Sequence, residues 1–210
     1  AAKALIPTSD PANLWKGGSE PFNDAGWLTG TTGVGFEASP GDAVNFTAFI
    51  GLNVIAMRNT ATSVYVRIPF NVADPAAFNA LTLRMRYDDG FVAYLNGTEV
   101  AGANKPAPLL WNSATNAGAG NPDTAAVNFE DFDITPHLGL LTAGRNILAI
   151  HGLNANTTSS DLLLQPELVG SRIETNAAGI AYTAAIPVSA QTTLRAAALS
   201  GGQWSALTEA

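Results

Sequence analysis

The chain has 210 residues, of which 47% are hydrophobic and only 13% are charged, and its net charge is -7. The hydrophobic content is enough for one packed core and argues against disorder. The acidic balance argues against binding to nucleic acid or to an anionic membrane surface. The absence of cysteine excludes disulfides and thiolate metal sites. No apolar run approaches the roughly 18 residues of a membrane helix, so we expect no membrane insertion.

Two stretches before residue 90 alternate between hydrophobic and polar side chains. In residues 64–72, the even positions are all hydrophobic, whereas Tyr65, Arg67 and Asn71 share the other face. Residues 81–87 repeat the pattern, with arginines on the polar face. A period of two predicts half-buried strands in both stretches.

The next stretch, "YDDGFVAYLNGTEV" (residues 87–100), predicts a hairpin. Asn96 and Gly97 separate two short strand-like runs, and both residues tolerate the positive φ of a two-residue turn. Further strands are predicted at 126–134, 146–153 and 161–170, and short helical turns at 74–81 and 136–141. Many short strands without a βαβ rhythm predict an all-β fold, an antiparallel β-sandwich that is jelly-roll-like.

The last clear predicted strand ends at residue 170, and this divides the chain into two parts. We expect residues 1–171 to form the jelly-roll sandwich. Residues 172–210 are too few to bury a core of their own, so we expect a small β-rich tail segment that packs on or extends the sandwich. Between residues 101 and 124 the sequence has no period and many turn formers, which predicts a long loop. Long loops in compact domains are usually functional or disordered.

Several motifs together resemble a known kind of module. They are F-x-D-x-x-W-x-x-G-x-x-G-V-G-F (22–36), YVRIPF (65–70), YDDGFVAYLNGTEV, GRNILAIHGLN (144–154) and SSDLLLQPEL (159–168). This set resembles the jelly-roll module of bacterial multi-domain extracellular proteins that carry lamin-tail or spore-coat kinase-like domains. Residues 192–210 are similar to the chitobiase C-terminal-type segment. The resemblance implies a galactose-binding-like sandwich in a protein that is secreted or on the cell surface.

The pair Asp88–Asp89 before Gly90 also resembles the lectin domain of the anthrax protective-antigen type. That resemblance implies that Asp88 and Asp89 bind calcium, and that calcium binds sugar hydroxyls. Calcium needs six to eight oxygen ligands, and Asn104, Asn121 or Asp123 in the long loop are candidates for the others. The alternative is that the pair only turns the chain, which is the commoner role of Asp and Gly.

The aromatic residues are the other candidates for sugar binding. Trp111 in the long loop is the first choice for a stacking platform, with Trp15 second, because a sugar face packs on a large ring. Ser159, Ser160 and Asp161 suit sugar hydroxyls, but capping and turning the chain is the favoured interpretation. No Gly-x-Ser-x-Gly elbow, histidine-rich metal spacing or marked carboxylate pair is found, so we expect no enzyme.

These observations predict a non-catalytic extracellular accessory module that binds carbohydrate. The expected ligand residues are Trp111, Asn104, Asp88 and Asp89, with calcium at the two aspartates and a glycan or matrix component as the partner. The alternative is a structural subunit or assembly domain of an extracellular filament, surface layer or matrix. Its partners would then be copies of itself or other surface proteins, joined through edge strands.

Overall fold

The computed structural model describes residues 1–116, 118 and 120–172, together with the backbone of four two-residue strands between residues 195 and 209. Contacts divide the chain into two units, Ala1–Ile173 and Glu174–Ala210. The second unit contains the pairs β12 (Arg195–Ala196) with β15 (Thr208–Glu209) and β13 (Leu199–Ser200) with β14 (Gln203–Trp204). The predicted packing of this tail on the sandwich lies outside the described residues.

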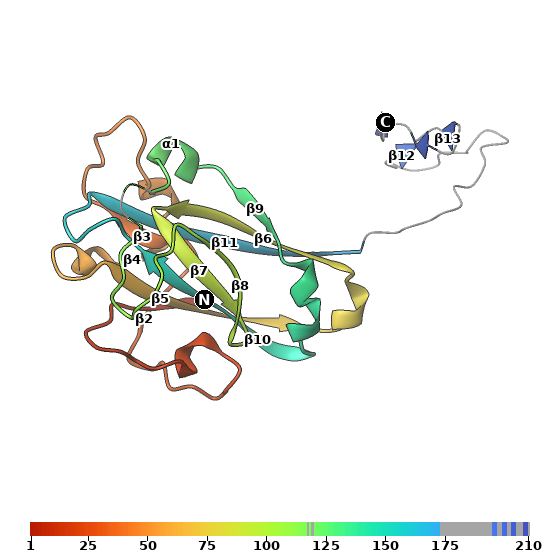
Figure 1. Cartoon of the computed structure of the whole chain (residues 1–210), viewed down its shortest axis with the longest axis horizontal. Coiled ribbons are helices and arrows are strands. Elements are labelled where there is room, and N and C mark those ends of the chain that lie inside the picture. The colour runs from red at the N-terminus through yellow and green to blue at the C-terminus, as the bar shows by residue number, and fades with distance from the viewer. Residues whose placement is uncertain are drawn as a thin grey trace. The chain divides into compact units, whose positions relative to one another are not determined.

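The first unit is an antiparallel β-sandwich, as predicted, with two sheets packed face to face (Figure 1). The six-stranded sheet has the order β2 (Leu28–Gly30), β1 (Ala2–Leu5), β5 (Ser63–Val72), β10 (Gly144–Leu153), β7 (Gly90–Leu95) and β8 (Thr98–Ala103). The five-stranded sheet has the order β4 (Leu52–Asn53), β3 (Val34–Glu37), β11 (Asp161–Ser171), β6 (Ala80–Asp88) and β9 (Glu130–Asp133). The chain crosses repeatedly between the two sheets, for example from β5 to β6, from β6 to β7 and from β10 to β11, which gives the jelly-roll character.

Helical segments are short, and none in the described part of the chain is long and apolar enough to cross a bilayer. They are η1 (Leu14–Lys16), η2 (Thr47–Phe49), η3 (Ile55–Met57), η4 (Pro75–Ala77), α1 (Asp123–Ala126) and η5 (Thr135–Leu140). The turn predicted at 74–81 is η4, in which the Asp74 carboxylate accepts a hydrogen bond from Ala76 N. The strand predicted at 126–134 is shorter than expected. Residues 123–126 form α1 instead, and only Glu130–Asp133 pair with β6.

The hydrophobic core lies between the sheets and is built from the alternating positions of the strands. Val64 and Val66 of β5 face Leu83 and Met85 of β6 in one buried cluster, with Phe91 of β7 beside them. The predicted hairpin between β7 and β8 is confirmed. Asn96 and Gly97 have φ values of 47° and 93°, the paired positive angles that a two-residue hairpin turn requires.

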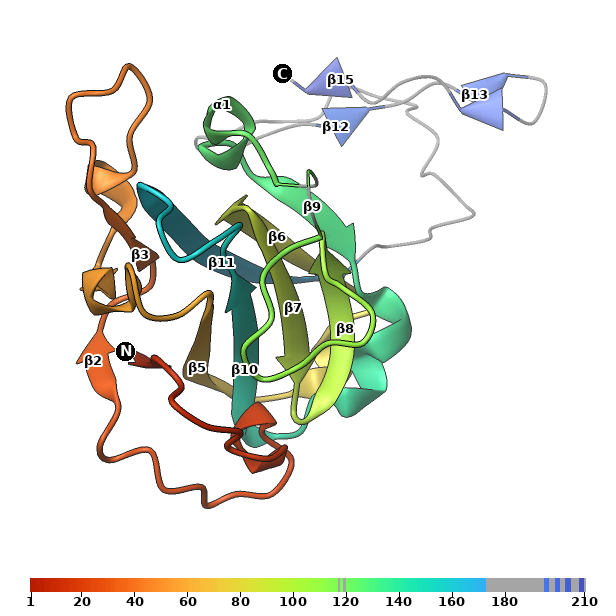
Figure 2. The ribbon, with the colours of Figure 1, turned by 60° about the vertical axis from the view of Figure 1, so that its left-hand side comes forward.

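The outer face of the six-stranded sheet is covered, which the alternation in β5 does not predict. Tyr65 and Arg67 lie on that face and are nonetheless buried. Two segments cover it. One is the N-terminal stretch around η1, and the other is the loop that follows β8, which arches over β7 and β10 in Figure 2. A second hydrophobic cluster therefore forms outside the sandwich, around Trp15 and Tyr94.

Candidate functional site

Three carboxylates meet where β6 ends and β11 begins. Asp88 is the last residue of β6, Asp161 is the first of β11, and Asp123 is the first of α1. Asp88 pairs with Leu163, so Asp161 and Asp88 lie on the same, outer face of the five-stranded sheet. One carboxylate oxygen of each residue lies within 4.8 Å of the others. We call Asp88, Asp123 and Asp161 the acidic cluster, and it is a group that could hold a metal ion.

Asp88 is the most unusual member of the acidic cluster. Its exposed fraction is 2%, and its Oδ2 has no hydrogen-bond partner among the described residues. Burial, with the nearby carboxylates of Asp89 and Asp161, raises the pKa of Asp88 to about 9. Burial and the carboxylate of Asp123 also raise the pKa of Asp161, and side-chain hydrogen bonds with Ser160 and Asp88 oppose that rise. An anion at Asp88 is therefore unfavourable unless a positive charge is supplied to it.

Asp89 has a different surrounding from Asp88, although the two are adjacent. Its Oδ2 accepts a hydrogen bond of 2.6 Å from Ala155 N, and its carbonyl accepts one of 2.7 Å from Asn104 Nδ2 and one from Asn121 N. Gly120 also packs here, since a Cβ at that position would lie 2.3 Å from Asp89 Oδ1. Asp89 and Asn104 thus join the two ends of the long loop to the loop before β11, beside the acidic cluster.

A pocket of about 140 Å³ lies on the outer face of the six-stranded sheet. We call it the aromatic pocket. Trp15 stacks on Tyr65 with ring centroids 4.3 Å apart and meets Tyr94 edge-on. Its lining residues are Asp10, Ala12, Asn13, Trp15, Lys16, Tyr65, Tyr94, Leu109, Leu110, Trp111 and His151. Aromatic walls with a few polar groups are typical of small-molecule and sugar sites.

Hydrogen bonds from β5 hold the long loop over the aromatic pocket. The Tyr65 hydroxyl donates to the carbonyl of Trp111 across 2.6 Å, and Ser63 Oγ donates to the carbonyl of Ser113 across 2.7 Å. Ser63 Oγ also lies 2.8 Å from His151 Nε2. Burial, and secondarily the charge of Lys16, lowers the pKa of His151 to about 3. His151 is therefore a neutral polar group at the floor of the pocket.

A larger cavity of about 340 Å³ opens between the sheets at the other end of the β6–β11 pair. Its walls are mostly aliphatic and aromatic, among them Ile68, Phe70 and Leu168, and no ionisable side chain lines it. It lacks the convergent polar groups that orient a polar ligand, so its size does not make it the better candidate site.

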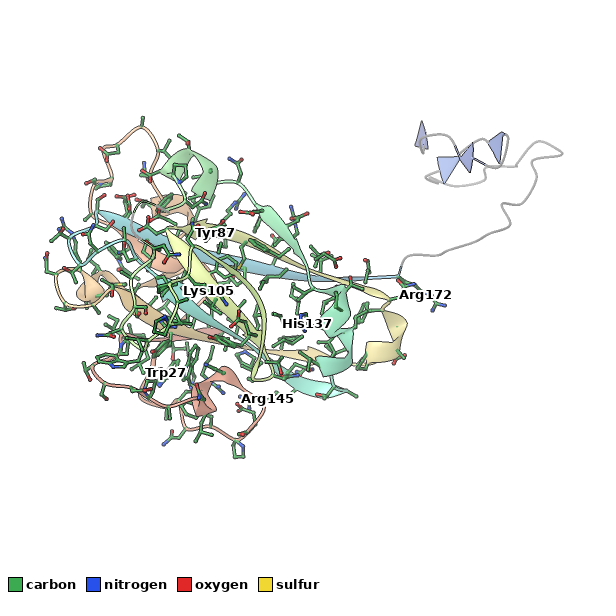
Figure 3. All side chains as sticks on the ribbon, viewed as in Figure 1. Trp27, Tyr87, Lys105, His137, Arg145 and Arg172 are labelled. Carbon is green, nitrogen blue, oxygen red and sulfur yellow. The ribbon has the colours of Figure 1, made fainter. Side chains whose placement is uncertain are left out.

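The residues predicted from the sequence divide among three places. Trp111 lines the aromatic pocket, Asp88 belongs to the acidic cluster, and Asp89 and Asn104 fix the loop ends between segments. The sequence predicts a capping or turning role for Asp161 and does not place it with Asp88. One sequence feature could have indicated that Asp88 and Asp161 lie together. Asp161 begins a predicted strand, and Asp88 lies at the end of another, so pairing of the two strands would bring both residues to one end of the sheet. Tyr87, labelled in Figure 3, marks this end of the sandwich.

The comparisons with known proteins yield structural likeness only. No family model matches the sequence, and no curated protein matches it. A calcium-binding mutant of Bacteroides uniformis beta-glucuronidase 2 is 15% identical with a TM-score of 0.40, and the match covers 79% of this chain and 17% of that one. The exo-chitosanase of Amycolatopsis orientalis is 13% identical with a TM-score of 0.42, covering 78% and 20%. The chain thus spans 20% or less of these two proteins.

Proposed function

We propose that the chain is a non-catalytic accessory module of an extracellular protein and that it binds carbohydrate in the aromatic pocket. The observation that carries the proposal is the composition of the pocket wall. The almost fully buried rings of Trp15, Tyr65 and Tyr94 and the half-buried ring of Trp111 line one hollow that also holds polar and charged side chains. Sugar rings present apolar C–H faces and a rim of hydroxyls, so they need both kinds of surface.

The polar groups of the pocket can act on different hydroxyls. Lys16 Nζ lies 4.4 Å from the centroid of the Tyr94 ring and can donate hydrogen bonds. Asp10 can only accept, and one of its oxygens already accepts from Ala12 N across 2.8 Å. Asn13 can do both. Donors and acceptors around an aromatic floor would fix the orientation of a bound sugar.

The number of carboxylates in the aromatic pocket supports a binding role more than a hydrolytic one. Glycosidases use a pair of Asp or Glu residues that flank the bond to be broken. Of the described residues that line the aromatic pocket, Asp10 alone has a carboxylate. The acidic cluster is a separate group of residues and shares none of them with the pocket wall.

A glycan array followed by calorimetry with the best glycan tests the proposal. Trp111→Ala should weaken glycan binding by about fivefold, because a stacked ring contributes roughly 1 kcal/mol and 1.4 kcal/mol is tenfold. Trp27→Ala is the matched control. Trp27 is also a half-buried tryptophan of the outer cluster, but it does not line the pocket. Figure 3 labels its position.

Two results would contradict this function. One is an array without hits for protein that is folded by circular dichroism. The other is an equal loss of affinity in both tryptophan variants. An array without hits, combined with self-association in size-exclusion chromatography, would instead support the assembly alternative, in which edge strands such as β8 join copies of the chain.

A further inference from the structure

The acidic cluster combines three carboxylates with a buried oxygen that has no partner. Asp88 Oδ2 is such an atom, and Asn154 Oδ1 is another, beside the same group of residues. Asn154 donates from Nδ2 to the carbonyl of Asp161 across 3.3 Å, which places its side chain against the start of β11. Buried oxygens without a donor are costly in a native protein unless a cation or a donor satisfies them.

Among the described residues, no Lys, Arg or His side chain forms an ion pair with the cluster. One carboxylate oxygen each of Asp88, Asp123 and Asp161 lies within 4.8 Å of the others. Like charges at this separation repel one another, so the arrangement is stable with all three ionised only if a positive charge is held between them.

The spacing of the oxygens fits a calcium ion. Calcium lies about 2.3–2.6 Å from each ligand oxygen, so two ligands on opposite sides of it are separated by roughly 5 Å. The three carboxylate oxygens lie within 4.8 Å of one another. The group offers only oxygen ligands, which suit calcium or magnesium and not the softer transition metals.

We propose that Asp88, Asp123 and Asp161 bind one calcium ion. Asp88 and Asp161 supply ligands from the outer face of the sheet, and Asp123 supplies one from the first residue of α1. Asp123 is not buried, so water can complete the six to eight ligands that calcium takes. Calcium is favoured over magnesium because magnesium demands near-ideal octahedral geometry and retains its own waters.

The ion would close the long loop against the sheet. Asn121 already fixes this region, since its Nδ2 donates to the carbonyl of Tyr87 across 2.7 Å and its main-chain N donates to Asp89. A cation bound by Asp123, Asp88 and Asp161 would add an electrostatic attraction that holds the end of the long loop against the sheet. This site is distinct from the proposed glycan pocket, and its test does not depend on a glycan.

The test is a calorimetric titration of the chelator-treated full chain with calcium chloride, together with thermal unfolding with and without calcium. We expect one ion per chain and a higher melting temperature with calcium, since a ligand that binds the native state stabilises it. Magnesium chloride in a parallel titration should bind more weakly. Tighter binding of magnesium than of calcium would overturn the choice of ion.

Three variants locate the ion. Asp123→Asn should weaken calcium binding at least about tenfold. Asp88→Asn should abolish it, because a neutral amide replaces the buried carboxylate ligand. Asp42→Asn is the control, an exposed aspartate outside the cluster, and should leave binding unchanged. The proposal is wrong if folded wild-type protein shows neither heat nor a melting shift in millimolar calcium. It is also wrong if Asp42→Asn weakens binding as much as Asp123→Asn does.

Discussion

Arg67 and Asp24 form an ion pair under the N-terminal segment, in which the arginine Nε donates to Asp24 Oδ2 across 3.0 Å. The guanidinium is fully buried. It also donates to Glu20 Oε1 across 2.6 Å and to the carbonyl of Trp15. Burial alone would raise the pKa of Asp24, but hydrogen bonds from Lys3 and Arg67 hold it below its usual value. One side chain of β5 thus fixes the segment that forms one wall of the aromatic pocket.

Replacing Arg67 should therefore destabilise the protein strongly. We expect Arg67→Met to lower the free energy of unfolding by about 3 kcal/mol or more, because Glu20, Asp24 and the Trp15 carbonyl each lose a buried hydrogen-bond donor, and only Asp24 keeps a close ion pair, with Lys3. Urea unfolding measures this change. Arg84→Met is the control. Arg84 pairs with Asp131 and Glu167 on an exposed surface, so its loss should cost at most about 1 kcal/mol. Equal effects of the two substitutions would contradict the role assigned to Arg67.

His151 should make the stability depend on pH. Its folded pKa of about 3 is lower than the 6.5 of the unfolded chain, so the unfolded state takes up a proton first as the pH falls. Neutral His151 makes its full contribution to the free energy of unfolding above pH 6.5. This contribution is lost between pH 6.5 and about 3, at roughly 1.4 kcal/mol per pH unit. In His151→Gln this part of the loss should disappear. Unfolding at pH 7.5 and pH 5 measures it, and parallel profiles for the two proteins would refute the prediction.

Gly33 should not tolerate a side chain. Its φ is +87°, and a Cβ there would lie 1.9 Å from the carbonyl oxygen of Phe49. We expect Gly33→Ala to cost at least about 1–2 kcal/mol from the backbone angle alone, with the clash in addition. Gly41→Ala provides the comparison, because a Cβ at Gly41 meets nothing within 4 Å. Thermal unfolding of both variants distinguishes them, and an unchanged melting temperature for Gly33→Ala would be inconsistent with the structure.

Tyr65 should hold the long loop through its hydroxyl. Tyr65→Phe removes the hydrogen bond to the Trp111 carbonyl and should cost about 1 kcal/mol. Cleavage by chymotrypsin near Leu109 to Trp111 should also become faster, because the loop opens more often. Tyr94→Phe tests the specificity, since Tyr94 lines the same pocket without a bond to that carbonyl. Unchanged cleavage in Tyr65→Phe would mean that other contacts hold the loop.

The strands and the β7–β8 hairpin could be predicted because their signals are local. Alternation in residues 64–72 and the Asn96–Gly97 turn depend on neighbours in the sequence. The burial of Tyr65 and Arg67 could not be predicted in this way, since it depends on a segment far along the chain that crosses the sheet. The sequence suggested Asp88 as a ligand residue through its resemblance to a lectin motif. It could not show that Asp161, rather than adjacent Asp89, lies with Asp88, because that follows from the pairing of β6 with β11.

The long loop contributes Trp111 to one site and Asp123 to the other, so a single segment takes part in both. A ligand that orders either end reduces the conformational entropy that remains to be lost when the other end is ordered. Thermodynamic reciprocity then applies to the proposed ligands. The factor by which calcium tightens glycan binding must equal the factor by which the glycan tightens calcium binding. Under the two proposals, the calcium concentration would therefore set how tightly the aromatic pocket holds a glycan.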